Sequence, residues 1–134
     1  MRNSTCQSCG KTLKIVKSTN KKYCSNKCQH DYQYQQKILK WKSGEDVGWT
    51  GKTRQLKHFV RRYLLDKHKN TCVECGWNKI HPVDCLPLVE VDHIDGNAEN
   101  CTESNLRVLC PNCHSMTPTF RARNPKSNRG KPLV

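Results

Sequence analysis

Four polar side chains in one segment have the types that phosphodiester hydrolysis needs: Asp92, His93, Asn105 and His114. That reaction requires an activated water, charge neutralisation on the phosphoryl group and help for the leaving oxygen. A histidine is the natural base near neutral pH, and a carboxylate with an imidazole can hold one divalent cation and leave positions open. Taken alone, His93 fits a buried structural histidine, Asn105 a cap and His114 a zinc ligand beside Cys113. Their joint occurrence favours a hydrolytic site.

These side chains need a local fold that brings them together. Residues 88–94 read as a strand and residues 106–109 as the returning strand, and Pro111 suits the first turn of a helix. Consecutive strand residues point to opposite faces, so Asp92 and His93 cannot both reach one point from an ideal strand. We therefore expect a strand–loop–strand–helix order with a bulge or a strand end at His93.

Eight of the ten cysteines form two sets of four, each built from two close pairs. The sets are Cys6, Cys9, Cys24 and Cys28, and Cys72, Cys75, Cys110 and Cys113. Because hydrophobic residues make up only 34% of the 134-residue chain, a small core needs such a staple. Closely spaced pairs suit tetrahedral zinc better than disulfides. We predict two structural Zn²⁺ sites and interpret Cys85 and Cys101 as ordinary free thiols.

The residues Asp92-His93, Asn105 and His114 within C-P-N-C-H, flanked by cysteine pairs, resemble the zinc-bearing branch of the HNH endonucleases over residues 53–120. The resemblance implies a ββα-metal, treble-clef-like nuclease domain. It implies that His93 is the general base and that Asp92 and His114 hold a catalytic Mg²⁺ or Mn²⁺, other divalent ions being open. Asn105 would brace the loop that carries His93. The chain also resembles the small homing endonucleases of phages and mobile introns, although restriction or packaging nucleases share these motifs.

The elements around the site predict a small α+β zinc-stabilised protein in four parts. Residues 1–44 form a four-cysteine zinc-finger module with a helix, and residues 45–52 a linker. Residues 53–122 form the nuclease domain, and residues 123–134 a basic flexible tail.

Three finer expectations concern local structure. A hairpin is expected between the N-terminal cysteine pairs, over residues 11–23. A helix is expected over residues 29–42, where apolar side chains recur at helical spacing. A second helix is expected over residues 53–68, with Thr53 as its N-cap.

The formal charge of +13 is unevenly distributed. Residues 1–70 carry +13, residues 71–119 carry −5 and residues 120–134 carry +5, so an acidic segment lies between two basic ones. Basic segments suit phosphates and an acidic pocket suits a divalent cation. We expect double-stranded DNA as the partner. The candidate DNA-binding residues are Arg107, Arg61, Arg62, Lys57, Arg121 and Arg123.

Some alternatives stay open at this stage. No secretory signal follows Met1 and no apolar stretch spans a membrane, so a cytoplasmic protein is expected, in the host cell if a phage encodes it. A non-catalytic zinc-dependent nucleic-acid-binding protein would explain the charge and both cysteine sets. An RNA-directed nuclease would explain everything except the substrate. The sequence leaves open whether the chain is a monomer or a dimer.

Overall fold

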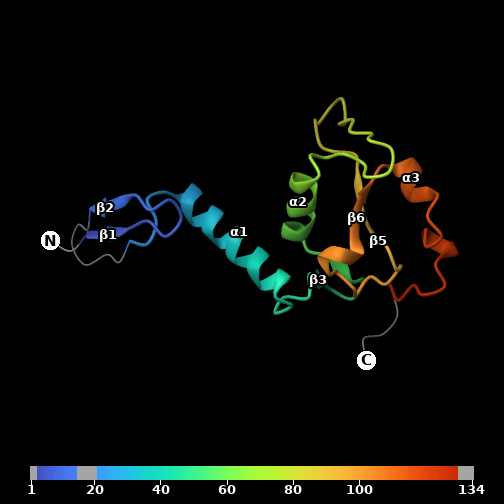
Figure 1. The fold of residues 1–134 in the computed structure, drawn as a ribbon, viewed down its shortest axis with the longest axis horizontal. Coiled ribbons are helices and arrows are strands. Elements are labelled where there is room, and N and C mark those ends of the chain that lie inside the picture. The colour runs from blue at the N-terminus through green and yellow to red at the C-terminus, as the bar shows by residue number, and fades with distance from the viewer. Residues whose placement is uncertain (1–2, 15–20, 130–134) are drawn as a thin grey trace. The chain divides into compact units, whose positions relative to one another are not determined.

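The computed structural model describes residues 3–14 and 21–129, and the chain divides into two compact units, residues 1–40 and 41–134 (Figure 1). No helix within the described ranges combines the length and the apolar character needed to cross a membrane.

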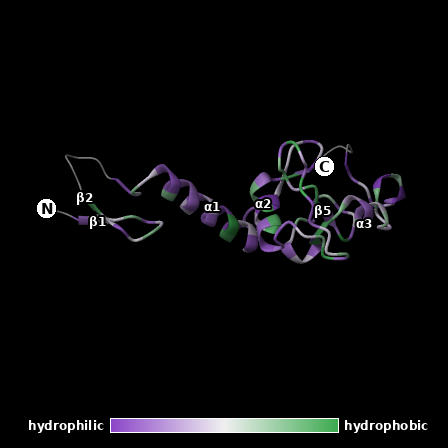
Figure 2. Cartoon of the chain, turned by 90° about the horizontal axis from the view of Figure 1, so that it is seen from above, coloured by the Kyte–Doolittle hydropathy of each residue, from purple (hydrophilic) through white to green (hydrophobic). Residues whose placement is uncertain are grey.

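The first unit contains a small hairpin and most of a long helix. Strands β1 (Asn3–Thr5) and β2 (Thr12–Lys14) pair antiparallel, with Ser4 opposite Leu13. Helix α1 (Asn26–Lys42) begins after Ser25, whose Oγ accepts a 3.1 Å hydrogen bond from the backbone N–H of Cys28 as an N-cap does. Hydrophilic residues dominate α1 in Figure 2, and burial of apolar surface contributes little along most of its length.

Two expectations for this unit have different outcomes. The helix predicted over residues 29–42 is confirmed and starts three residues earlier, at Asn26. The hairpin predicted over residues 11–23 is wrong in position, because β1 and β2 flank the first cysteine pair. Residues 15–20 of that prediction lie outside the described residues.

In the second unit, two helices flank an antiparallel strand pair. Strands β5 (Glu90–His93) and β6 (Leu106–Leu109) pair with Asp92 opposite Arg107 and His93 opposite Leu106. Helices α2 (His58–Lys67) and α3 (Pro111–Ser115) lie on either side of this pair in Figure 1.

The core of this unit is aliphatic. The side chains at 0–1% exposure belong to α2, β6 and the residue before β5: Val60, Leu64, Val89, Val108 and Leu109. Burying each such side chain contributes about 1.5–3 kcal/mol. This core fixes β5 and β6, which carry the candidate site.

The local predictions for this unit are confirmed in part. The returning strand over residues 106–109 and the helix opening at Pro111 match β6 and α3. The N-cap at Thr53 is wrong: α2 begins at His58 after Lys57, and no side chain caps it. The preceding residues extend instead, because β4 (Gln55–Leu56) pairs with β3 (Trp49–Thr50), which lies within the predicted linker.

Two buried residues anchor the irregular segments of the second unit. Trp41, at the end of α1, donates from Nε1 to the backbone oxygen of Cys101 at 2.7 Å. Arg54 is 2% exposed, and its guanidinium contacts Glu99 Oε1 at 2.5 Å and the backbone oxygen of Asn128 at 2.5 Å. Both anchors hold the segment between β5 and β6.

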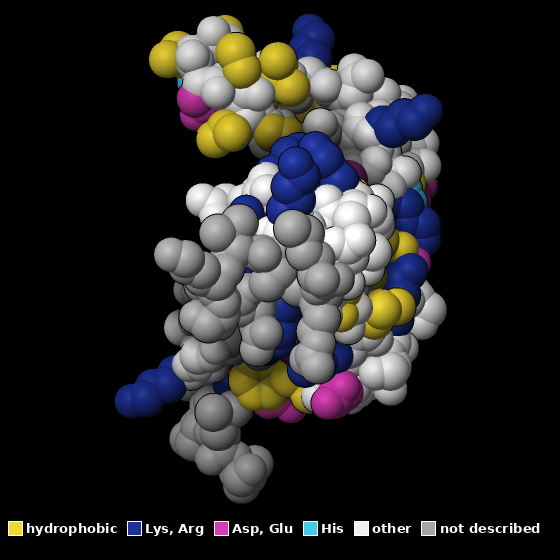
Figure 3. All heavy atoms as spheres, turned by 90° about the vertical axis from the view of Figure 1, so that its left-hand side faces the viewer, with side chains coloured by type: hydrophobic (Ala, Val, Ile, Leu, Met, Phe, Trp, Pro, Cys, Tyr) yellow, Lys and Arg dark blue, Asp and Glu magenta, His cyan; other side chains and the backbone are white. Residues whose placement is uncertain are grey.

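The segment between α2 and β5 lies at the top of Figure 1, and hydrophobic side chains gather at the same end of the molecule in Figure 3. Val83 is 85% exposed and Leu86 is 61% exposed. An isolated antiparallel bridge between Ile80 and Pro87 closes this loop. The loop therefore presents apolar side chains at the surface.

Candidate functional site

A cavity of about 300 Å³ opens beside β5 and α3. Asp92 and His93 of β5 and His114 of α3 all line it. Asp92 is 6% exposed and His93 8% exposed, so both side chains are buried at its wall. His93 is the last residue of β5 and a turn follows it. The strand end that we expected at His93, which lets consecutive residues reach one cavity, is therefore present.

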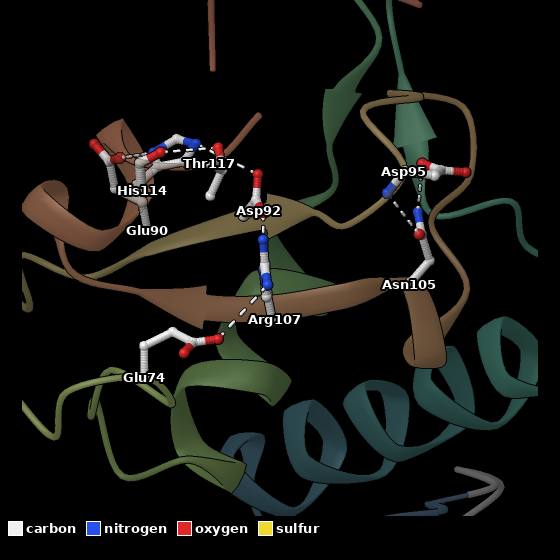
Figure 4. Close-up of polar contacts among 8 residues, drawn as sticks. All are labelled: Glu74, Glu90, Asp92, Asp95, Asn105, Arg107, His114 and Thr117. Atoms are coloured by element: carbon white, nitrogen blue, oxygen red, sulfur yellow. Dashed lines mark hydrogen bonds and ion pairs between the residues drawn. The ribbon is translucent and has the colours of Figure 1, made fainter. Parts of the chain in front are cut away.

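The two oxygens of the Asp92 carboxylate have different neighbours (Figure 4). Oδ1 lies 3.5 Å from Nε2 of His114, and Oδ2 accepts a 2.9 Å hydrogen bond from Nε of Arg107. Arg107 also lies 3.7 Å from Glu74. Arg107 thus compensates the buried negative charge from one side and leaves Oδ1 directed toward the histidine.

His114 lies between two carboxylates. Its Nδ1 contacts Glu90 Oε2 closely, and its Nε2 is directed at Asp92 (Figure 4). The Phe120 ring packs edge-on against the imidazole, with ring centroids 5.1 Å apart. A carboxylate on one ring nitrogen fixes the orientation of a metal-binding imidazole. Because both nitrogens face carboxylates, His114 is placed toward the cavity and not toward the sulfurs beside Cys113.

His93 contacts a buried thiol. Its Nε2 lies 3.3 Å from Sγ of Cys101, and that sulfur lies 3.3 Å from the backbone oxygen of Ala98. Burial lowers the pKa of His93, the positive charge of Arg129 lowers it further, and Asp92 opposes both effects. Burial also raises the pKa of Cys101 to about 11, so the group beside His93 is a neutral thiol at pH 7.

Asn105 ties together the loop between β5 and β6. The residue is 9% exposed. Its Oδ1 accepts a hydrogen bond from the Asp95 N–H at 3.1 Å, and its Nδ2 donates to Asp95 Oδ1 at 2.9 Å (Figure 4). Its Nδ2 also donates to the backbone oxygen of Asn100 at 2.7 Å. Its own backbone oxygen accepts from the N–H of Ile94 at 2.8 Å. The turn that directly follows His93 is therefore held by one side chain.

Both cysteine quartets can hold a metal ion. Within each set the four sulfurs lie within 4.8 Å of one another. The Cys24–Cys28 and Cys75–Cys110 sulfur pairs are 3.4 and 3.7 Å apart, close to the spacing of about 3.8 Å between thiolates bound at 2.3 Å to one tetrahedral ion. In the second set, burial opposes ionisation of Cys72 but backbone N–H groups lower its pKa to about 6, whereas a hydrogen bond with Cys110 raises the pKa of Cys113 to about 12. The spacing of the sulfurs is therefore the property that suits a cation.

The predicted DNA-binding residues are dispersed. Arg107 is engaged with Asp92 and Glu74, whereas Arg121 lines the cavity. The others lie on α2, beside it or in the short helix η2 (Arg121–Arg123), and do not line the cavity: Arg61, Arg62, Lys57 and Arg123. The structure therefore places two of the six predicted residues at or beside the candidate site.

Sequence reasoning missed three neighbours of the site. Glu90 was not among the predicted site residues, yet it contacts His114. Its i, i+2 spacing from Asp92 on one strand was an available signal, because such residues share a face of the sheet. Cys101 was interpreted as an ordinary thiol, and no spacing indicated its contact with His93. Arg129 lines the cavity from a segment that the sequence assigned to a flexible tail.

Two curated phage proteins are similar to this chain. An H-N-H endonuclease, F-TflIV, of Escherichia phage T5 is 35% identical over 88 residues, 63% of this chain and 37% of that protein. A probable HNH endonuclease of Lactococcus phage SK1 is 32% identical over 72 residues, 52% of this chain and 74% of that protein. The chain therefore spans about a third of the first relative's length and about three quarters of the second's. No family model and no solved structure matches. The similarity to both relatives places this chain in the HNH endonuclease family.

Proposed function

We propose that this chain is a DNA endonuclease that hydrolyses phosphodiester bonds and requires a divalent metal. One observation supports this most directly: Asp92, His93 and His114 line a single cavity. The relatives carry the name endonuclease, and the charge of +13 suits a polyanionic substrate.

In this proposal Asp92 and His114 hold the catalytic ion, because Asp92 Oδ1 and His114 Nε2 are directed at each other across 3.5 Å. A Mg²⁺ or Mn²⁺ ion bound there would supply neutralisation of charge on the phosphoryl group and the leaving oxygen. Glu90 orients His114 through Nδ1, and Arg107 holds the second oxygen of Asp92. These two residues position the proposed metal ligands.

His93 is the proposed general base, and the neighbouring thiol sets its tautomer. Because the Cys101 S–H is directed at the Ala98 oxygen, its sulfur is left to accept from Nε2–H of His93. The lone pair is then on Nδ1, which takes the proton from the attacking water. A lowered pKa keeps the imidazole neutral and able to accept a proton at pH 7. Asn105 keeps the turn after His93 in place.

We further infer that both quartets bind structural Zn²⁺ and that β5, β6 and α3 form a ββα-metal nuclease fold. The order strand, strand, helix supports this, as does the Cys110–Cys113 pair, which spans the start of α3. The N-terminal quartet with its basic surroundings is proposed to strengthen DNA binding. A homing-type role is proposed from the resemblance of the motifs to those of small phage-encoded homing endonucleases, and restriction and packaging are the alternatives.

Cleavage of supercoiled plasmid by the purified chain, with added Mg²⁺ or Mn²⁺, tests the proposal. We expect conversion to nicked or linear DNA that stops with EDTA. The His93→Ala variant should lose activity while keeping its DNA affinity, and His58→Ala is the matched control because His58 is not buried and does not line the cavity.

Three results would contradict the proposal. Binding without cleavage under every divalent ion would favour a non-catalytic nucleic-acid-binding protein. Preferential cleavage of RNA of the same sequence would overturn the DNA substrate. Full activity of His93→Ala would remove His93 as the base.

A further inference from the structure

The segment that follows α3 returns to the turn after His93. Asn124 donates from Nδ2 to the Gly96 oxygen at 2.7 Å, and Asn128 donates from Nδ2 to Asn97 Oδ1 at 2.9 Å. The backbone oxygen of Asn128 also accepts from the buried guanidinium of Arg54 at 2.5 Å. We call residues 120–129 the strap, because hydrogen bonds at both of these asparagines attach it to the site loop.

Gly96 shows how closely the strap approaches that loop. A Cβ at this position would lie 2.7 Å from Asn124 Oδ1 and 2.8 Å from Thr119 Cγ2, and the residue has a φ of +74°. Only glycine can adopt this positive φ without strain and also fit without a Cβ in the space that the loop and the strap leave. The loop and the strap therefore pack without room for a side chain between them.

The strap brings a cation to the catalytic cavity. Arg129 is exposed and lines the same 300 Å³ cavity as Asp92, His93 and His114. The guanidinium therefore shares this cavity with the proposed base and with both proposed metal ligands, and it remains accessible to a phosphate.

A phosphate in this cavity needs such a cation. The carboxylates of Glu90 and Asp92 line it and would repel a phosphodiester. Arg107 is already engaged with Asp92 at 2.9 Å and with Glu74 at 3.7 Å, and it does not line the cavity. Arg121 does line the cavity, but its guanidinium packs over the Phe120 ring, 4.9 Å from the ring centroid. A guanidinium can bind two phosphate oxygens at once, which a lysine cannot do in the same geometry.

We propose that Arg129, delivered by the strap, binds the non-bridging oxygens of the scissile phosphate and stabilises the charge that develops on them. This inference rests on the proposed nuclease function. Arg129 is then a catalytic residue. Asn124, Asn128 and Arg54 are positioning residues that hold the strap.

The test compares Arg129→Ala and Arg129→Lys with Lys126→Ala, which removes one positive charge from the same strap at an exposed residue that does not line the cavity. Plasmid nicking should show kcat lowered about 100-fold in Arg129→Ala, the scale seen for one lost transition-state contact. Arg129→Lys should recover only part of kcat, and Lys126→Ala should stay within about twofold of wild type. The pair Asn124→Ala/Asn128→Ala should lower kcat by about tenfold with Arg129 still present.

A binding measurement separates this inference from the function it rests on. These measurements use the His93→Ala background and plot log Kd for a short DNA duplex against the logarithm of the salt concentration. Adding Arg129→Ala should lower the slope of this plot by about 0.9, and adding Lys126→Ala should leave the slope unchanged. Inactive wild-type protein would refute the nuclease proposal, and the salt slopes would still decide whether Arg129 contacts a phosphate. Equal kcat and equal slopes for Arg129→Ala and Lys126→Ala would overturn the assignment of Arg129.

Discussion

Replacing Asn105 by alanine should destabilise the protein by about 3 kcal/mol, since three side-chain hydrogen bonds of 3.1, 2.9 and 2.7 Å are lost and each contributes about 1 kcal/mol. This is a large share of a typical domain stability of about 5–15 kcal/mol, yet it leaves the chain folded. Urea unfolding of the metal-loaded protein measures it. Plasmid nicking should fall about 100-fold in parallel, because the turn after His93 loses its fixed position.

Asn100→Ala is the matched control. Its Nδ2 donates to Asp95 Oδ2 at 2.8 Å, but the residue is partly exposed and the change should cost about 1 kcal/mol. If both variants lose the same small amount, Asn105 does not brace the loop and the reasoning is refuted.

The pH dependence gives an independent check of the same contacts. Burial raises the pKa of Asp95, but hydrogen bonds from Asn100, the Asn97 N–H and Asn105 outweigh it and hold the pKa below its ordinary value. A lowered folded pKa gives stability that is present above the unfolded value of about 3.9 and is lost as pH falls through the folded value. Asn105→Ala removes one of these donors. The stability difference between wild type and variant should therefore shrink below about pH 4.

Three further predictions concern other groups. Cys72→Ser should reduce bound zinc, measured by mass spectrometry, from two ions per chain to one, whereas Cys85→Ser, outside both quartets, should keep two. Cys101→Ala should lower kcat about 10-fold, and ¹⁵N NMR should then show a mixture of the two His93 tautomers. Cys101→Ser should restore the Nε2–H tautomer. If Cys101→Ala leaves the His93 tautomer unchanged, the thiol does not determine that tautomer. Arg54→Met should lower the free energy of unfolding in urea by about 2–3 kcal/mol, because it removes buried hydrogen bonds to Glu99 in the loop and to Asn128 in the strap. A decrease of less than about 0.5 kcal/mol would contradict the proposed anchoring role of Arg54.

The parts that the sequence predicted correctly depend on short-range patterns. Strand β6 and helix α3 follow from an apolar run and from Pro111 at the first helical turn, and both lie where they were expected. The cysteine sets were identified by their spacing alone, and the structure gathers the same eight sulfurs into two groups. The N-cap at Thr53 failed because β4 pairs with β3 and keeps the chain extended up to Lys57, a tertiary effect that local propensity does not contain.

The groups that support the site could not be predicted because their partners are distant in sequence and generic in type. Arg54 is one of 24 basic residues, and only the fold shows that it is buried against Asn128, 74 positions later. Like Cys85, Cys101 has no close cysteine partner in the sequence, so the sequence does not distinguish the two. Its contact with His93 exists only because the loop between β5 and β6 folds back. Residue types that do chemistry are few and can be recognised, whereas hydrogen-bonded supports can be built from many residues. Variation at those supports is therefore where related chains can differ in rate while they keep the same reacting groups.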